Sequence, residues 1–417
     1  MNNTLPKNGL RARLLPKKQD LDRFSHDNEM NQGANYEIID PEENKVWGYV
    51  TIDNTQRGPG LGGIRMAPNV SLQEVNRLAR VMTLKNSAAC LPHGGAKSGL
   101  VINNPAFYKD RQIKTELMEK FSEALFELDQ YVPAPDMGTD EYDIQIIYEH
   151  HSKKLETKVH NRGGAGRPVE HGGIPLDEWG LTAHGLFAAA MTIENLVDNF
   201  KLNNSRVIIQ GFGNVGCPTA EKLNEKGAVV VGASDINCAL WNPKGLDLNE
   251  LGKIRKLEGG LSLYTKQVDK RFCTKKLDWL LEAPCDILVP AARPDAITSK
   301  NIDRIDCRII LQGANTPSSK SVEYYLKHRR NILSLTDFIV NAGGVIGCAV
   351  ELNLAKDSSY ANKVEAKGLR AYTEKLVFDT VSKNVKEIYK RMRGDSIFRD
   401  TATELAYERL KNQEVWL

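Results

Sequence analysis

The feature that most constrains this fold is the run RVIIQGFGNVG, residues 206–216, where a β-branched segment leads directly into a glycine-rich turn. Gly211 permits a tight turn, Gly213 lets a phosphate approach the backbone, and Gly216 lets a following helix pack closely on the strand. Asp235 closes the next apolar run, where a carboxylate can accept hydrogen bonds from the ribose of an adenine dinucleotide and would repel a 2′-phosphate. The pattern predicts a unit that binds NAD, with NADP less favoured because no arginine follows Asp235 closely. A purely structural glycine turn and an ordinary turn aspartate are the alternatives.

Strands and helices alternate on both sides of this turn. Continuous β-branched runs such as VVV are typical of a parallel sheet that is buried on both faces. A long amphipathic helix is expected over 176–197 and a second helix over 214–226. Strands are expected over 206–210, 228–234, 285–292, 308–314 and 332–340. The alternation predicts a doubly wound α/β domain of the Rossmann type over residues 176–345.

A second α/β assembly is predicted before this domain, over residues 35–175. A hairpin is expected over 36–53, and the spacing of Ser71 and Glu74 is typical of a helix start. Further strands are expected over 98–102 and 131–136, and further helices over 113–128 and 141–151. The glycine-rich stretch 156–175 is the best candidate for a linker.

The two ends of the chain have different patterns. Residues 1–34 are basic and lack a hydrophobic segment, so they predict a flexible tail, with a targeting peptide as the alternative. Residues 346–417 are helical in pattern. We expect these C-terminal helices to return to the first domain by packing across the hinge.

The composition excludes several classes of protein. Lysine and arginine number 56 against 53 aspartates and glutamates, so no net field favours nucleic acid or a membrane. No apolar run approaches the ~20 residues that cross a bilayer. The seven cysteines form no CxxC pair and the eight histidines show no ligand spacing. The sequence therefore predicts neither disulfides nor a metal site, which is typical of the reducing cytoplasm.

Two lysines stand in unusual surroundings. Lys85 lies in a largely apolar helical run, and Lys97 follows a Pro-His-Gly-Gly-Ala turn in which little covers the backbone. Desolvation in a closed, glycine-lined pocket would lower the pKa of an ammonium toward the range of a general base. For either lysine alone, a surface position beside a structural turn is an equal alternative.

Eight short motifs follow one another in order within residues 45–351. They are GPGLGGIRM, the KNS of Lys85, GGAKSG around Lys97, PAPDMGT around Asp136, GFGNVG, CDILVPAA, QGAN and NAGGV. In this order they resemble the glutamate/leucine/phenylalanine/valine dehydrogenase family. The resemblance implies a substrate-binding and oligomerisation domain over 35–175 and an NAD-binding domain over 176–345. It also implies reversible oxidative deamination of an L-amino acid to its 2-oxo acid and ammonia.

The resemblance further implies a role for each matching residue. Lys85 would bind the substrate α-carboxylate, Lys97 would activate the water that attacks the imine, and Asp136 would move a proton to and from the amino group. The substrate-binding residues are expected to be Lys85, Leu61, Gly62, Met82, Asn341 and Cys348. The cofactor-binding residues are expected to be Gly211, Gly213, Asn214, Val215, Gly216, Asp235, Thr182, Ala291 and Asn315.

The choice of substrate is less clear from the pattern. Family members that act on glutamate usually carry a lysine at Leu61, a glutamine at Met82 and a serine at Cys348. A glutamate side chain against Leu61 without a cation would cost several kcal/mol, whereas an apolar side chain would gain ~1.5–3 kcal/mol on burial. These three residues favour an apolar substrate, although the GANTPSS and GRPVEHGG segments are more similar to glutamate enzymes.

The sequence therefore predicts an NAD-dependent amino-acid dehydrogenase with an apolar substrate of the leucine, valine or phenylalanine kind. A glutamate dehydrogenase is the main alternative, and a catalytically silent NAD-binding paralogue is a more remote one. A hydroxy-acid dehydrogenase would leave Lys97 unexplained. The resemblance also implies a homo-oligomer, a hexamer or octamer, and we expect a cytoplasmic protein.

Overall fold

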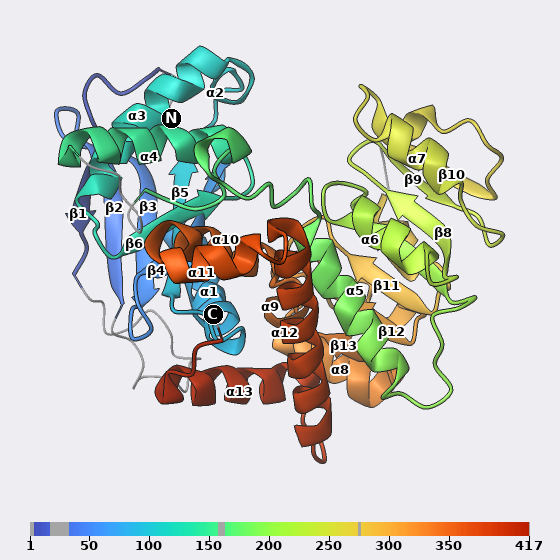
Figure 1. The fold of residues 1–417 in the computed structure, drawn as a ribbon. Coiled ribbons are helices and arrows are strands. Elements are labelled where there is room, and N and C mark those ends of the chain that lie inside the picture. The colour runs from blue at the N-terminus through green and yellow to red at the C-terminus, as the bar shows by residue number, and fades with distance from the viewer. Residues whose placement is uncertain (1–3, 17–32, 157–162, 274–276, 417) are drawn as a thin grey trace. The chain divides into compact units, whose positions relative to one another are not determined.

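The chain forms two compact units (Figure 1). The computed structural model describes residues 4–16, 33–156, 163–273 and 277–416. Unit 1 comprises Met1–Pro175, Gly347–Gly368 and Ala406–Leu417. Unit 2 comprises Leu176–Ile346 and Leu369–Leu405. The C-terminal stretch, which we expected to return to the first domain, is therefore divided between the two units.

Unit 1 is built on a six-stranded mixed sheet with the order β1-β2-β3-β5-β4-β6. The strands are β1 (Arg11–Leu14), β2 (Ala34–Asp40), β3 (Lys45–Asn54), β4 (Gly60–Ala67), β5 (Gly94–Val101) and β6 (Tyr131–Pro135). The β2–β3 hairpin forms where the sequence predicts it. β4 is parallel to both β5 and β6, and β5 is antiparallel to β3. The carboxyl ends of β4, β5 and β6 therefore lie at the same edge of the sheet.

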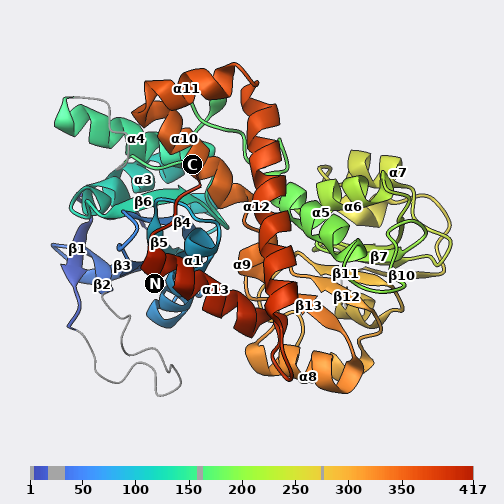
Figure 2. The same ribbon diagram turned by 60° about the horizontal axis from the view of Figure 1, so that its bottom comes forward.

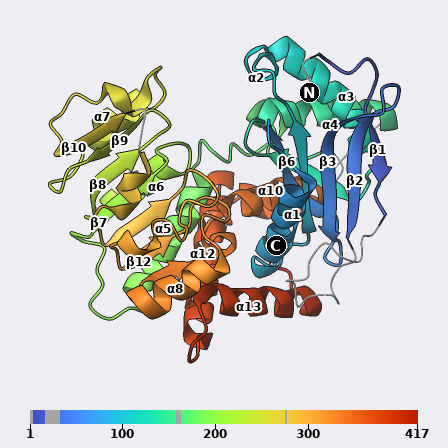
Figure 3. The same ribbon diagram turned by 180° about the vertical axis from the view of Figure 1, so that it is seen from behind.

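Helices cover both faces of this sheet. They are α1 (Leu72–Ala88), α2 (Ala106–Lys109), α3 (Arg111–Phe126) and α4 (Glu141–Leu155). A further helix of unit 1 is α11 (Ser358–Glu365). The side chain of Ser71 accepts a hydrogen bond from the backbone N–H of Glu74, so α1 begins where the spacing predicts. α1 packs against β3 and β5 (Figure 3). α3 and α4 contribute Phe121 and Ile144 to a core on the other side, with Trp47 and Ile64 from the strands.

The N-terminal segment is more ordered than predicted. Within the expected tail, β1 pairs antiparallel with β2, with Arg11 opposite Ile39. Leu10 is fully buried in the core of unit 1, and its N–H donates to the carbonyl of Lys120. The prediction of a flexible tail is wrong for this stretch because burial of Leu10 and an open sheet edge outweigh its polar composition. Residues 17–32 of the predicted tail lie outside the described residues.

Unit 2 contains a seven-stranded sheet with the order β10-β9-β8-β7-β11-β12-β13. The strands are β7 (Arg206–Gln210), β8 (Val229–Ser234), β9 (Cys238–Trp241), β10 (Lys270–Cys273), β11 (Ile287–Pro290), β12 (Ile309–Leu311) and β13 (Leu333–Leu335). β8, β7, β11, β12 and β13 are parallel, as the β-branched runs predict. The strand order turns back at β7, so the carboxyl ends of β7 and β11 flank a topological switch point, where ligands bind in such sheets.

Two predictions about this sheet need correction. β9 is antiparallel to both β8 and β10, so the sheet is mixed at one edge. The three residues between β8 and β9 are too few for the helical crossover that a parallel neighbour needs. The strand expected over 332–340 ends at Leu335, because Asp337 begins the short helix α9.

The helices of unit 2 flank its sheet. They are α5 (Leu181–Glu194), α6 (Gly216–Asn224), α7 (Leu248–Ile254), α8 (Lys320–Arg330), α9 (Asp337–Val340) and α12 (Leu369–Arg391). Two more helices cross the unit boundaries in sequence, α10 (Gly343–Lys356) and α13 (Phe398–Asn412). α5 starts later than predicted, because Gly180 before it has a left-handed φ of 60°. α12 packs against α5 (Figure 2).

Short 3₁₀ helices complete the fold. They are η1 (Val169–His171), η2 (Gly260–Leu263), η3 (Leu277–Glu282) and η4 (Ile302–Arg304). In the part of the chain that the structure describes, no helix combines the length and apolarity that crossing a bilayer requires. The mixed α/β class predicted from the sequence is confirmed.

Replacing Leu10 by alanine tests the order of the N-terminal segment. Because Leu10 is fully buried, we expect L10A to lower the free energy of unfolding by about 2–5 kcal/mol. Urea denaturation followed by circular dichroism measures this. Leu14, which is 62% exposed, provides the matched control, and L14A should change stability by no more than about 0.5 kcal/mol. Equal stabilities for L10A and the wild type would mean that the segment is frayed.

Candidate active site

Lys97 lies on β5, an interior strand of the unit 1 sheet. The glycines before Lys97 belong to this strand, where we had expected a turn. A Cβ at Gly62 would lie 1.7 Å from the carbonyl oxygen of Ala96, and one at Gly95 would lie 2.2 Å from Thr83. The glycine run therefore lets β4 and α1 approach β5 closely. Gly62, predicted to bind substrate, has this packing role in the structure.

Lys97 forms a buried ion pair with Asp136, which follows β6. Lys97 Nζ lies 2.5 Å from Asp136 Oδ2, and the side chains are 4% and 16% exposed. β4 lies between β5 and β6, and its Ile64 pairs with Ser98 of β5 and with Pro135 of β6. This register brings Lys97 and Asp136 together across β4. A Cβ at Gly63 of β4 would lie 2.7 Å from the Asp136 Cβ and 3.0 Å from Lys97 Nζ, so this glycine leaves room for the pair.

Arg65 and Glu74 extend the ion pair into a chain of four charges. Arg65 Nε lies 3.4 Å from Asp136 Oδ2, and Arg65 Nη1 lies 2.5 Å from Glu74 Oε1. The Arg65 side chain is 7% exposed and that of Glu74 is 23% exposed. Two cations and two carboxylates therefore balance one another in a nearly closed environment.

The surroundings shift the pKa of both partners of the ion pair. Burial lowers the pKa of Lys97, and the opposing attraction of Asp136 does not fully compensate for it. Burial alone would raise the pKa of Asp136, but Lys97 and Arg65 outweigh it and hold that pKa at about 2. The lowered pKa of Lys97 has the direction that a general base requires.

Neutral hydrogen bonds hold Asp136 in place. Its N–H donates to Thr139 Oγ1 over 3.0 Å, and the Thr139 hydroxyl donates to the carbonyl of Ile64 over 2.7 Å. The Tyr131 hydroxyl donates to the carbonyl of Gly62 and pairs with the Ser98 hydroxyl, both over 2.9 Å. β4, β5 and β6 are thereby tied together at the edge that carries the charges.

The other predicted substrate residues of unit 1 are buried. Lys85 lies on α1 and is 5% exposed, and the next residue, Asn86, donates to the carbonyl of Gly94 over 2.5 Å. This hydrogen bond fixes the last turn of α1 against the start of β5. Leu61, Met82 and Cys348 are also buried. Burial raises the pKa of the Cys348 thiol, so it behaves as a small apolar group.

In unit 2 the glycine turn has the geometry that a dinucleotide requires. Gly211 has a φ of 91°, and its Cβ position lies 2.8 Å from Ala292. A Cβ at Gly216 would lie 2.0 Å from the carbonyl oxygen of Gly211, so the helix can pack only with glycine there. Gly213 is exposed with no atom within 4 Å of its Cβ position, which leaves its backbone open to a phosphate. These residues fit a pyrophosphate at the N-terminus of α6, where Val215 is the N-cap.

Asn214, predicted to bind the cofactor, has a partner within unit 2. Its side-chain amide donates to Asp177 Oδ2 over 2.9 Å. This hydrogen bond links the glycine turn to the segment before α5. Asn214 therefore stabilises the turn whether or not it also contacts the cofactor.

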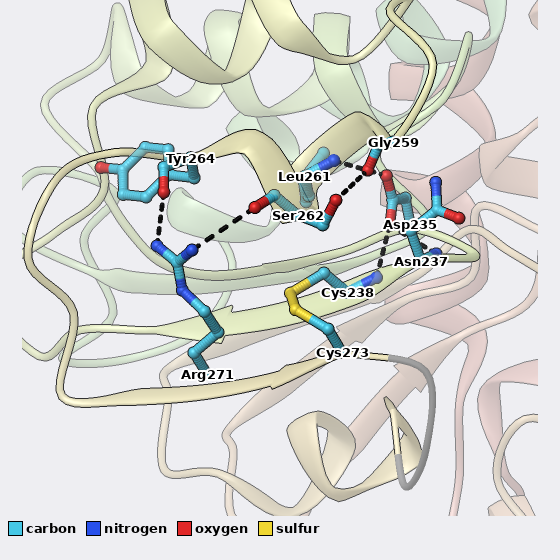
Figure 4. Close-up of a disulfide and its surroundings, with 9 residues drawn as sticks. All are labelled: Asp235, Asn237, Cys238, Gly259, Leu261, Ser262, Tyr264, Arg271 and Cys273. Atoms are coloured by element: carbon cyan, nitrogen blue, oxygen red, sulfur yellow. Dashed lines mark hydrogen bonds between the residues drawn. A yellow bond between two sulfur atoms is a disulfide. The ribbon is translucent and has the colours of Figure 1, made fainter.

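Asp235 lies at the carboxyl end of β8, as predicted, within a frame of backbone N–H groups (Figure 4). Its Oδ1 accepts from Asn237 over 2.8 Å and from Cys238 over 2.7 Å, and its Oδ2 accepts from Leu261 over 2.7 Å. The carboxylate therefore also serves as a turn residue, the alternative that the sequence left open. Each carboxylate oxygen can accept two hydrogen bonds, so capacity for a ribose hydroxyl remains on Oδ2.

A disulfide joins Cys238 to Cys273 beside this frame (Figure 4). The two residues are directly opposite one another in the antiparallel pair β9–β10. The prediction that the chain has no disulfide is therefore wrong. The sequence spacing gave no indication of this pairing, because the two cysteines meet only through the register of strands that were not predicted. Cys90, Cys217, Cys285, Cys307 and Cys348 are not disulfide-bonded.

The remaining predicted residues of unit 2 are Asn341, expected to bind substrate, and Ala291, Asn315 and Thr182, expected to bind the cofactor. The side-chain amide of Asn341 donates to the carbonyl of Gly313 and to Asn315 Oδ1, both over 3.2 Å. The Cβ position of Gly313 lies 2.9 Å from the Cβ of Ala291, at the end of β11. Thr182 lies on the first turn of α5, with its hydroxyl 3.6 Å from the Cβ position of Gly344.

Sequence reasoning did not find the chain of charges around Asp136. Arg65 was not among the predicted site residues, and Glu74 was predicted only as part of a helix start. Two signals were available, since Arg65 follows Gly63 on the same face of β4 and Glu74 is an acid in the first turn of α1. Among the described residues, no group of three or more metal-binding side chains is present.

Two family models cover most of the chain. Residues 172–415 match the family described as glutamate/leucine/phenylalanine/valine dehydrogenase. Residues 35–153 match the family described as the Glu/Leu/Phe/Val dehydrogenase dimerisation domain.

Several curated proteins are similar over most of their length. The glutamate dehydrogenase of Aeropyrum pernix is 33% identical, over 87% of this chain and 84% of that protein. The NADP-specific glutamate dehydrogenase of Saccharolobus shibatae is 32% identical, over 87% of this chain and 83% of that protein. The catabolic NAD-specific glutamate dehydrogenase of Bacillus subtilis is 34% identical, over 72% of this chain and 68% of that protein.

Solved structures share the fold. A hetero-hexameric glutamate dehydrogenase from Thermus thermophilus superposes with a TM-score of 0.75 at 23% identity, covering 89% of this chain and 86% of that one. Glutamate dehydrogenase 2 of Plasmodium falciparum gives a TM-score of 0.71 at 25% identity, covering 92% of this chain and 85% of that one.

Thiol titration tests the disulfide. Because five cysteines lie outside the disulfide, we expect five thiols to react with Ellman's reagent in denatured, unreduced protein and two more after reduction. The matched control is C238S, in which the thiol of Cys273 should react without any reductant. Seven reactive thiols in unreduced wild-type protein would contradict the Cys238–Cys273 bond.

Proposed function

Because this chain belongs to the glutamate/leucine/phenylalanine/valine dehydrogenase family, we propose that it catalyses the reversible oxidative deamination of L-glutamate to 2-oxoglutarate and ammonia with NAD. The observation that carries the reaction type is the buried pair of Lys97 and Asp136, with Nζ and Oδ2 2.5 Å apart. The choice of glutamate is supported by the names of the curated relatives.

Lys97 is the proposed general base. Its lowered pKa makes the neutral amine easier to form, and the neutral amine can take a proton from the water that attacks the substrate imine. Loss of that ammonium charge removes the main attraction that keeps the pKa of Asp136 low. The proton affinity of Asp136 then rises, and its carboxylate can take a proton from the substrate amino group.

Lys85 is the proposed anchor of the substrate. An ammonium group that is 5% exposed on α1 binds an α-carboxylate as a point charge in a poorly solvated environment. Asn86 holds this end of the helix against β5. The α-carbon would thereby keep a fixed position relative to the groups on β5 and β6, which lowers the entropic part of the barrier.

The dinucleotide, when bound, supplies the hydride chemistry. Gly213 and the N-terminus of α6 would hold its pyrophosphate, and Asp235 would accept hydrogen bonds from its ribose. We favour NAD over NADP, since a 2′-phosphate would meet the Asp235 carboxylate. The curated relatives include both NAD-specific and NADP-specific enzymes.

An apolar amino acid is the second candidate substrate. Leu61 is fully buried where glutamate enzymes usually carry a lysine, and Met82 and Cys348 are buried as well. Arg65 is engaged with Glu74 and Asp136, so it does not replace that lysine. The substrate side-chain carboxylate would therefore need another cation.

Two further expectations accompany this proposal. We propose a homo-oligomer, because residues 35–153 match a dimerisation domain, and a hexamer or octamer is the state that the family resemblance implies. Small molecules, namely the amino acid, its 2-oxo acid and ammonia, are the proposed partners. The expected cytoplasmic location rested on the absence of disulfides, and the Cys238–Cys273 bond removes that support.

Replacement of Lys97 tests the reaction type. We expect K97A to lower turnover by about 10²–10⁴-fold, because general-base catalysis is lost. The affinity for NAD should remain unchanged, since Lys97 lies in unit 1 and the glycine turn in unit 2. Steady-state kinetics and calorimetric NAD binding measure the two effects. The control is K109A at an exposed lysine of α2, and near-normal turnover in K97A would contradict the assigned role.

A substrate panel with the variant L61K decides between the two substrates. We expect the wild type to reduce NAD with L-glutamate and not with leucine, valine or phenylalanine. L61K should then change the KM for glutamate while leaving the specificity in place. If the wild type instead turns over only the apolar amino acids and L61K gains activity on glutamate, the second candidate is correct.

A further inference from the structure

The guanidinium group of Arg65 contacts two carboxylates. One nitrogen, Nη1, lies 2.5 Å from Glu74 Oε1, and another, Nε, lies 3.4 Å from Asp136 Oδ2. The contact with Glu74 is a charge-assisted hydrogen bond, whereas the contact with Asp136 is longer than a hydrogen bond. Glu74 therefore holds Arg65 back from full engagement with Asp136.

We propose that Glu74 and Arg65 are positioning residues that set the charge balance of the Lys97–Asp136 pair. This inference rests on the proposed function, because it concerns the groups assigned to the same reaction. Neither residue needs to touch the substrate. Glu74 acts through Arg65, and Arg65 acts through Asp136 and Lys97.

The backbone fixes both residues in these positions. Glu74 lies in the first turn of α1, and its N–H is capped by Ser71. Arg65 lies on β4, which pairs with β5 in parallel with Arg65 opposite Gly99. Because Gly63 precedes Arg65 by two residues, both face the same side of the sheet, and Gly63 leaves the space that Lys97 and Asp136 occupy.

Four ionisable groups face one another at this place, namely Arg65 on β4, Glu74 on α1, Lys97 on β5 and Asp136 after β6. Tyr131 of β6 lies on the opposite face of the sheet, where its hydroxyl bonds to Ser98 and to the carbonyl of Gly62. Burial raises the pKa of Tyr131, with a smaller contribution from Asp136, so this hydroxyl stays neutral in the working range. The charge that Lys97 experiences therefore comes from Asp136, Arg65 and Glu74.

The sign of each effect follows from electrostatics. Removing the negative charge of Glu74 destabilises the nearby ammonium, so E74Q should lower the pKa of Lys97. Removing the positive charge of Arg65 stabilises the ammonium, so R65Q should raise that pKa. These directions agree with the influence of each group on Lys97 in the intact protein. The two substitutions therefore have opposite effects, which a general loss of structure cannot produce.

The first test is the pH dependence of kcat/KM for amino-acid oxidation. Activity requires neutral Lys97, so it rises as pH increases through the pKa of this residue. We expect the acidic limb to move to lower pH in E74Q and to higher pH in R65Q, each by on the order of half a unit to one unit. E74D keeps the negative charge, so the acidic limb of its kcat/KM profile should lie close to the pH of the wild-type limb.

The matched control removes a carboxylate at the surface of the same unit. Glu116 is 49% exposed on α3 and pairs only with Lys120 among the ion pairs described. E116Q should leave the limb where it is in the wild type. A reduced kcat at every pH without a moved limb in E74Q would indicate a merely structural role and contradict the proposal.

A second test does not depend on turnover. Only a neutral amine reacts with formaldehyde, so the extent of reductive methylation of Lys97, followed by peptide mass spectrometry across pH, reports its protonation. The midpoint should be lower in E74Q and higher in R65Q than in the wild type. Equal midpoints in all three proteins would overturn the inference. Shifted midpoints in a protein that oxidises no amino acid would contradict the proposed function and leave the charge balance in place.

Discussion

The close approach of β4 and β5 is the constraint on which the proposed site depends. Their backbones come together where the chain has glycine, and a Cβ at Gly62 would overlap the carbonyl of Ala96. Gly63 opens the space beside this contact for Lys97 and Asp136. Because water is excluded from this space, burial becomes the largest influence on the pKa of Lys97. A larger residue in place of either glycine would separate the strands and readmit water.

Buried charges must be compensated, and unit 1 does this with a balanced set. Lys97 and Arg65 face Asp136 and Glu74, so the cluster carries no net charge when all four groups are ionised. An isolated ion in this position would cost several kcal/mol in desolvation. Chemistry that removes a proton from one member changes the proton affinity of the others. The same balance that makes burial possible therefore makes the site responsive to protonation.

Unit 2 uses glycine in a different way, at a turn between β7 and α6. Gly211 and Gly216 are required by packing, whereas Gly213 leaves backbone N–H groups accessible. At the neighbouring strand end, three backbone N–H groups orient the carboxylate of Asp235. One of these donors belongs to Cys238, which the disulfide links to the edge strand β10. The proposed ribose contact therefore lies in a part of the sheet that is covalently tied.

The amino-acid sequence by itself determined the class of the fold, the parallel strands β7, β8, β11 and β12, and the glycine turn. These features depend on residue patterns that are local in the chain, such as β-branched runs and glycine spacing. The tertiary structure alone decided that Leu10 belongs to the core, that Cys238 meets Cys273, and that Arg65 lies between Glu74 and Asp136. These three features depend on strand register and on which faces of the elements meet. Register and face contacts are not encoded in the spacing of residues along one segment.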